Sequence, residues 1–213
     1  MMLLRSGGRP AKAFAGMMPT GTISTDEIGD RISTLYDGRS WPNDPLWICA
    51  VDLDRGDRVV FGRKGHDAPI GVAVQASSSI PGFFRPVEHG KRRYVDGAVH
   101  SPTNADLLAD AGLDAVVIIS PMSATRRGHG PAWRSLRPLH AQQLATEVKA
   151  LRSRGIEVIT FQPTPADVDV MGRNAMDAQR RVATTASALA SARARIAGPD
   201  MTRRLAALRS TSR

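Results

Sequence analysis

The sequence has little cysteine, few aromatic residues and no long hydrophobic run. Its single cysteine, Cys49, excludes an intrachain disulfide framework and indicates a reducing compartment. Because Cys49 lies in the apolar run PLWICAVDL, we expect a small buried side chain rather than a reactive thiol. The apolar runs are far shorter than the roughly 20 residues that span a bilayer, and MMLLRSGG lacks the apolar centre of a signal peptide. We therefore expect a cytoplasmic protein, with peripheral membrane association left open.

Metal-ligand spacing is also missing. Zinc and related ions need several ligands at short, regular spacings, and the histidines do not show them. We therefore expect no metal and no other cofactor. The five histidines are His66, His89, His100, His129 and His140.

Positive charge, in contrast, is abundant. The formal net charge is +9, and much of it gathers after residue 173. This balance attracts anionic membranes or nucleic acid, although a solvated arginine-rich face looks the same. The basic segments lack interleaved aromatics and any known nucleic-acid-binding signature. Nucleic acid is therefore the least expected partner, contact with an anionic membrane surface stays open, and the oligomeric state is not predicted.

The length and composition predict one folded core. The chain has 213 residues, of which 42% are hydrophobic, enough for one sizeable domain. We predict an α/β domain over residues 1–197, followed by a basic tail over residues 198–213.

The first half of the chain predicts a helix, a hairpin and a second helix. The helix at about 25–36 begins with a capping box, in which Ser24 caps and Glu27 reaches back. LWICAVDL and RVVFG, separated by the turn DRGD, read as two paired strands. PIGVAVQAS begins with a proline, which suits the first turn of a helix.

The second half alternates strands and helices. RRYVDG predicts a short strand that ends at Asp96, and SPTNADLLADAG predicts a helix that stops at Gly112. DAVVIIS and EVITF are expected to be parallel neighbours, joined by the helix at 136–154 as a right-handed crossover. An alanine-rich helix follows at 175–197. Such alternation favours an α/β fold.

Asp96 is the best candidate for chemistry. It ends a predicted strand, and Gly97 permits a sharp turn after it. Carboxylates at the carboxyl ends of α/β strands often line a ligand crevice. An aspartate before a glycine is also a common turn former, so a structural role stays open at this point.

Three stretches together resemble the patatin-like phospholipase family: AVDLDRGDRVVFG, ASSSIPGFFRPV and YVDGAVHSPTN. The resemblance continues through DAVVIISPMS and MGRNAMDAQRR and covers about residues 19–197. It implies a three-layer α/β/α fold with a mostly parallel central sheet. It also implies hydrolysis of phospholipids or other acyl-ester lipids by a Ser–Asp dyad. Asp96 would then be the base, and Gly97 and Ala98 would shape its turn.

The sequence departs from the family in one respect. Neither the serine motif G-x-S-x-G nor the glycine-rich oxyanion motif is present; Gly38-Arg39-Ser40-Trp41-Pro42 is the nearest match. In the family both motifs lie upstream, so we expect a truncated domain whose N-terminal part is missing. The chain alone is then expected to be inactive. The alternative is a catalytically inactive patatin-like remnant or an interaction module.

Three local alternatives accompany this prediction. Ser77, Ser78 and Ser79 lack the glycines of a nucleophile elbow, so we expect them to pack tightly beside the turn. His100 follows Asp96 by four residues, but proximity in sequence does not make a triad. The pair Phe83–Phe84 would suit either an acyl pocket or the core.

Overall fold

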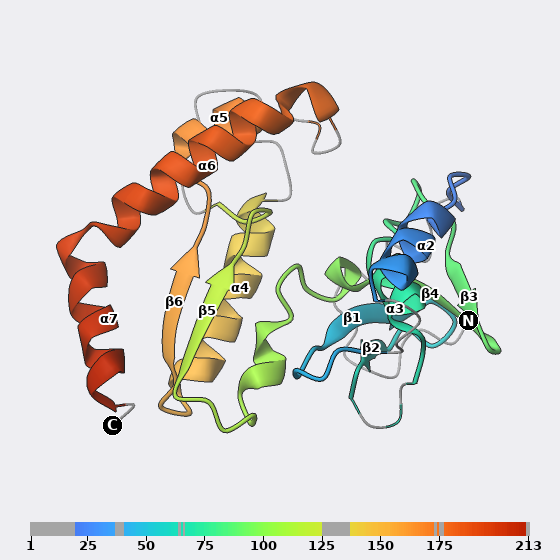
Figure 1. The fold of residues 1–213 in the computed structure, drawn as a ribbon, viewed down its shortest axis with the longest axis horizontal. Coiled ribbons are helices and arrows are strands. Elements are labelled where there is room, and N and C mark those ends of the chain that lie inside the picture. The colour runs from blue at the N-terminus through green and yellow to red at the C-terminus, as the bar shows by residue number, and fades with distance from the viewer. Residues whose placement is uncertain are drawn as a thin grey trace. The chain divides into compact units, whose positions relative to one another are not determined.

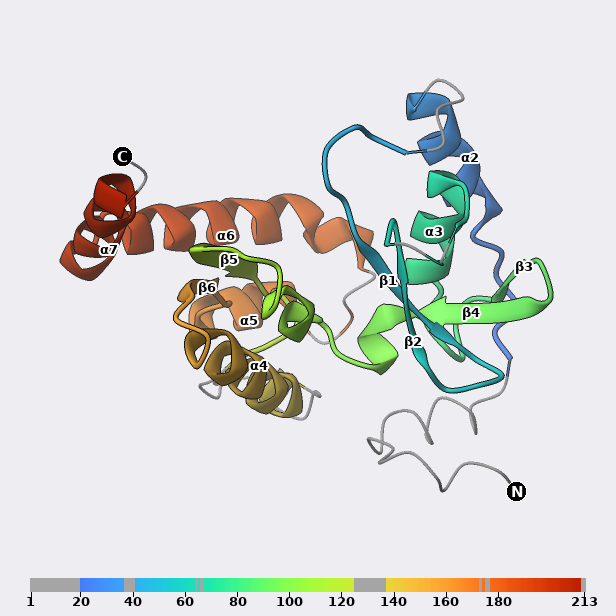
Figure 2. The same ribbon diagram turned by 90° about the horizontal axis from the view of Figure 1, so that it is seen from below.

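A computed structural model describes residues 20–36, 41–63, 65, 67–124, 137–172, 174 and 177–211. The chain divides into two compact units, residues 1–104 and 105–213, each with its own sheet (Figures 1 and 2). The single domain expected over residues 1–197 and the tail at 198–213 stay predictions. Within the described ranges, no helix is both long and apolar enough to cross a membrane.

The first unit contains a four-stranded antiparallel sheet in the order β2-β1-β4-β3. The predicted hairpin is confirmed, with Ile48 opposite Phe61. The expected mostly parallel sheet is wrong here, because all three strand pairs are antiparallel; two of these pairs, β1–β2 and β3–β4, are joined by turns of a few residues, which allow only the antiparallel direction. The strands are β1 (Ile48–Asp52), β2 (Arg58–Phe61), β3 (Val87–His89) and β4 (Arg92–Asp96).

Two helices, α2 (Asp26–Leu35) and α3 (Ile70–Ser77), pack against each other in this unit (Figure 2). Both helices were predicted, but the prediction of a capping box at the start of α2 is wrong. Ser24 Oγ accepts from the Asp26 backbone N–H at 3.1 Å, and the N-cap residue Thr25 makes no side-chain cap bond. Thr25 is buried instead, with its hydroxyl 3.3 Å from that of Ser79. Its tertiary contact therefore replaces the local cap.

The core of the first unit lies between the sheet and α3. Phe61 of β2 and Tyr94 of β4 meet edge to face with ring centroids 5.3 Å apart. Ala73 and Ala76 of α3 are fully buried in the same cluster. Small residues on α3 let the helix lie close to the sheet, and this packing fixes where the segment after Ser77 begins.

The second unit is built on two parallel strands. β5 (Ala115–Ile119) pairs with β6 (Glu157–Phe161), and α4 (Arg137–Arg152) lies between them in sequence, so the predicted parallel pair with its connecting helix is confirmed. Val116 and Ile118 of β5 are buried in one cluster with residues of α4. The other face of β5 is open: Val117 is 58% exposed and Ile119 is 74% exposed.

The remaining elements of this unit are helical. α5 (Pro165–Met171) begins with a complete capping box between Thr164 and Asp167, which the sequence analysis missed. The helix predicted at 175–197 corresponds to α6 (Arg181–Ile196), which follows a short 3₁₀ turn. Residues 175 and 176 of that prediction lie outside the described residues. α7 (Pro199–Thr211) follows.

The prediction of a helix that stops at Gly112 is wrong. Only a 3₁₀ turn, η2 (Ala105–Leu108), forms there. Asn104 just before it has a left-handed φ of 49°, a conformation that helices do not contain. The Ala105 backbone N–H donates to the buried carboxylate of Glu147 at 3.0 Å. A tertiary hydrogen bond therefore replaces the helical one.

Candidate functional site

Asp96 lies at the end of β4, as predicted, where the chain enters the 3₁₀ turn η1 (Gly97–Val99). Its backbone N–H donates to Ser79 O at 3.0 Å. Its side-chain Oδ1 accepts from the Ala98 backbone N–H at 2.8 Å. The backbone bond therefore holds the main chain of Asp96, and the bond from Ala98 orients its carboxylate.

Gly97 is required by close packing. A Cβ at this position would lie 2.4 Å from Cys49 O and 3.0 Å from Cys49 Cβ, on the neighbouring strand β1. Gly97 does not have a left-handed φ, so conformational freedom is not the reason for the glycine. Ala98, by contrast, is exposed. The turn crosses β1 at a distance that admits no side chain, and this defines its course.

The carbonyl of Gly97 anchors the other side of the turn. It accepts from the backbone N–H groups of His100 at 3.0 Å and Ser101 at 3.1 Å. The side-chain amide of Asn104 also donates to it, at 3.4 Å. Asn104 in turn accepts from Arg58 of β2 at 3.2 Å. Sequence reasoning missed Asn104 and Arg58, although an asparagine in SPTN is a known turn signal.

The surroundings of Asp96 favour the protonated acid. The side chain is half-buried, and this burial raises the pKa of Asp96 above its usual value, while the hydrogen bond from Ala98 partly offsets the effect. Within the described residues, the carboxylate has no ion-pair partner. Such a group differs from an ordinary surface aspartate, because it has a higher affinity for a proton.

Of the three serines, Ser79 contacts Asp96 through its backbone carbonyl, and its hydroxyl already has a partner. Ser79 is fully buried, and its hydroxyl donates to Gln75 O at 2.8 Å. Ser77 ends α3, and Ser78 caps it with its backbone N–H. Ser79 thus packs tightly beside the turn, as expected, and its hydroxyl is committed to structure.

Three exposed apolar side chains, which we call the rim, lie on the segment that follows Ser79 and on a segment that bridges to it. Ile80 follows Ser79 directly and is 41% exposed, and Phe83 is 43% exposed. Phe83 therefore does not belong to the core, whereas Phe84 is half-buried and meets it edge to face at 4.8 Å. Ile23, 47% exposed, comes from a segment that bridges to Phe84. The rim consists of Ile23, Ile80 and Phe83.

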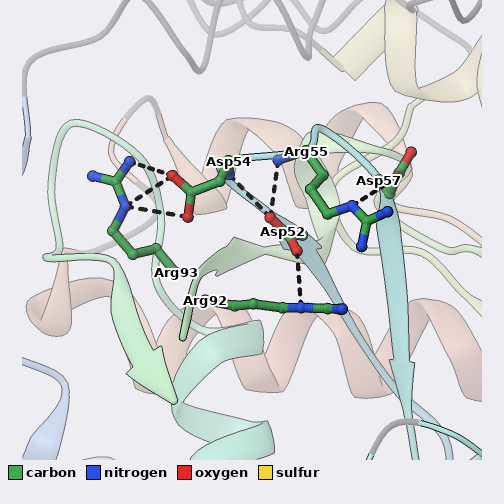
Figure 3. Close-up of polar contacts among 6 residues, drawn as sticks. All are labelled: Asp52, Asp54, Arg55, Asp57, Arg92 and Arg93. Carbon is green, nitrogen blue, oxygen red and sulfur yellow. Dashed lines mark hydrogen bonds and ion pairs between the residues drawn. The ribbon is translucent and has the colours of Figure 1, made fainter. Parts of the chain in front are cut away.

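A cluster of charges holds the opposite end of β4 (Figure 3). Asp52, only 1% exposed, accepts from the backbone N–H groups of Asp54 at 3.0 Å and Arg55 at 2.9 Å. Arg92 Nε lies 3.8 Å from the other oxygen of Asp52, and Arg93 Nε donates to Asp54 at 3.1 Å. Asp52 at the end of β1 and Asp54 in the turn after it thus contact Arg92 and Arg93, the first two residues of the strand that ends at Asp96.

These aspartates do not form a metal site. Their carboxylates face arginines and backbone N–H groups. Among the residues that the structure describes, no three histidine, cysteine, aspartate or glutamate side chains gather where they could hold a metal ion. Cys49, expected to be buried, is partly exposed on β1.

The first unit is therefore an α/β unit in which one strand ends at a half-buried aspartate. The position of this carboxylate and its raised pKa are typical of a general base. Residues 31–109 match the model of the patatin-like phospholipase family, which confirms the resemblance over this segment. At the level of the family, the match indicates lipid acyl hydrolysis. The matched segment contains Asp96 and Gly97 and is shorter than the resemblance over residues 19–197, whose remainder stays a prediction.

Proposed function

We propose that this chain contributes the catalytic base of a lipid acyl hydrolase. The observation that supports the proposal best is the carboxylate of Asp96, fixed by Ala98 and raised in pKa by burial. Its nucleophile would be a serine in a G-x-S-x-G segment, which these 213 residues do not contain. The substrate would be an acyl ester of a phospholipid or neutral lipid.

The reaction would proceed in two steps. The serine oxygen attacks the ester carbonyl while Asp96 takes the hydroxyl proton, and the protonated Asp96 then donates that proton to the departing alcohol. Water next attacks the acyl-serine, Asp96 again takes the proton, and the fatty acid leaves as the serine is protonated. A serine hydroxyl is a weak nucleophile, so a raised aspartate pKa improves the proton transfer.

The exposed rim supports a lipid substrate. Ile23, Ile80 and Phe83 expose apolar surface in the unit that contains Asp96. Ile80 is one residue from Ser79, whose carbonyl holds the Asp96 backbone. We propose that an acyl chain contacts these side chains as its ester approaches the carboxylate.

The second candidate is a patatin-like module without activity. It is favoured by the missing motif and by the hydroxyl of Ser79, which is already bonded to Gln75. Both candidates predict that the 213-residue chain hydrolyses no p-nitrophenyl ester and is not labelled by a fluorophosphonate probe. Turnover with a labelled serine would contradict both candidates.

Restoring the serine separates the two candidates. We would fuse a G-x-S-x-G-containing N-terminal segment from a patatin-like relative to this chain and measure ester hydrolysis. Asp96→Asn should then lower the rate about 10²- to 10⁴-fold, because an amide cannot accept the serine proton. The melting temperature should not fall, because the amide oxygen can still accept from Ala98. A fusion with no hydrolysis at all would favour the inactive module.

His100→Ala is the matched control. A dyad does not need this histidine, so the variant should keep its rate per folded molecule. An active Asp96→Asn variant together with a dead His100→Ala variant would show that the base has been assigned wrongly.

A further inference from the structure

Helix α6 carries an apolar stripe opposite the side that packs against α5. Thr184, Ser187 and Ser191 are partly buried, and the Ser187 hydroxyl donates to Asp167 of α5. The stripe consists of Val182, Leu189 and Ile196, which are 81%, 49% and 48% exposed. Because the three are seven residues apart, they lie along one side of the helix, nearly opposite the packed side.

The charged residues of α6 all have one sign: they are Arg181, Arg193 and Arg195. Residues 178–213 contain eight arginines and one aspartate, and Arg180, Arg203 and Arg204 pair with Asp177, Asp200 and Glu157. Arg193 lies four residues after Leu189 and three before Ile196, so it stands within the stripe. Arg195 has another role, because its guanidinium lies over the Phe161 ring at 5.4 Å. α6 itself contains no acidic residue.

We propose that the exposed side of α6 binds an anionic lipid surface, with the stripe inserted among the acyl chains and Arg193 among the headgroups. Val182 and Ile196 are fourteen residues apart, roughly 21 Å along the helix, so the helix would lie in the plane of the interface. The choice of lipid as partner rests on the proposed function. The apolar stripe and the positive charge match such an interface by themselves.

Two other partners fit less well. A second copy of α6 would place arginines against arginines with no acid to pair them, and these like charges repel. Nucleic acid would attract the arginines but would leave the three aliphatic side chains of the stripe without a partner.

The test measures binding of the full chain to sedimented vesicles. The vesicles consist of ether-linked phosphatidylcholine with or without ether-linked phosphatidylserine, so hydrolysis plays no part. We expect binding to the vesicles that contain phosphatidylserine. The double variant Leu189→Gln, Ile196→Gln should weaken this binding about tenfold or more through lost apolar burial. Arg193→Gln should weaken it about fivefold.

Ala188→Gln is the control, since it adds the same side chain to an exposed position of α6 away from the stripe and should leave binding unchanged. Circular dichroism confirms that each variant is folded. The proposal is overturned if the wild-type chain does not bind, or if the double variant binds as well as wild type. It is also overturned if DNA displaces the chain from the vesicles while the double variant binds them as the wild type does. The same holds if the double variant changes the oligomeric state and leaves vesicle binding unchanged. Because no ester is cleaved, these outcomes are independent of the role of Asp96.

Discussion

Replacing Gly97 with alanine tests the packing that places Asp96. The new Cβ would lie 2.4 Å from Cys49 O and 2.7 Å from Cys49 C, whereas a carbon and an oxygen in contact prefer about 3.3 Å or more. Both obstacles are backbone atoms of β1, which pairs with β2 and β4. They cannot turn aside as a side chain would, so one strand must move by nearly 1 Å.

Overpacking of this kind costs about 1–3 kcal/mol, and the rigid obstacle favours the upper end, about 3 kcal/mol. For a unit of about 100 residues, this lowers the melting temperature by roughly 15 °C. Thermal and urea unfolding followed by circular dichroism would measure the loss.

Gly29→Ala is the matched control. Its Cβ would meet the end of the Gln75 side chain at 3.0 Å, which can rotate away, and alanine favours the helix by up to about 1 kcal/mol over glycine. We therefore expect stability within about 1 kcal/mol of the wild type. A Gly97→Ala variant as stable as Gly29→Ala would refute the close approach to Cys49.

Three further predictions concern pH and solubility. Burial raises the pKa of Asp96, so the wild type loses stability as pH rises from about 4 through that pKa. Asp96→Asn should therefore have a higher melting temperature than the wild type at pH 8 but not below about pH 4. Equal melting temperatures of the two proteins at both pH values would contradict this. Burial opposes ionisation of Asp167, but hydrogen bonds from Ser187 and Thr164 hold its pKa below the usual value. Asp167→Asn should therefore lower the free energy of unfolding by about 1–3 kcal/mol at neutral pH. This loss should shrink as pH falls from about 4 through the lowered pKa. Urea unfolding at a series of pH values measures it, and a loss that stays constant with pH would argue against the prediction. The open face of β5 promotes association, so Ile119→Lys should reduce light scattering at a given concentration. Ile118→Lys, at a buried position, should not fold. Unchanged scattering by folded Ile119→Lys would exclude this face as the cause of association.

Local patterns in the sequence determined several elements correctly. The hairpin of β1 and β2, the strand that ends at Asp96 and the parallel pair β5–β6 follow from short apolar runs and turn residues, which act over a few neighbouring positions. The residues of ASSSIPGFF and YVDGAV were enough to indicate the resemblance to the patatin-like phospholipase family, which the match confirms over residues 31–109.

Tertiary structure alone decided what surrounds the candidate base. The capping box at Ser24 was lost because Thr25 is buried near Ser79, and a helix failed after Asn104, where the next N–H bonds to Glu147. The need for glycine at position 97 arises from Cys49, 48 positions earlier in the chain. The raised pKa of Asp96 is likewise a consequence of burial. Such distant contacts form only when strands pair and helices pack, so no local pattern contains them.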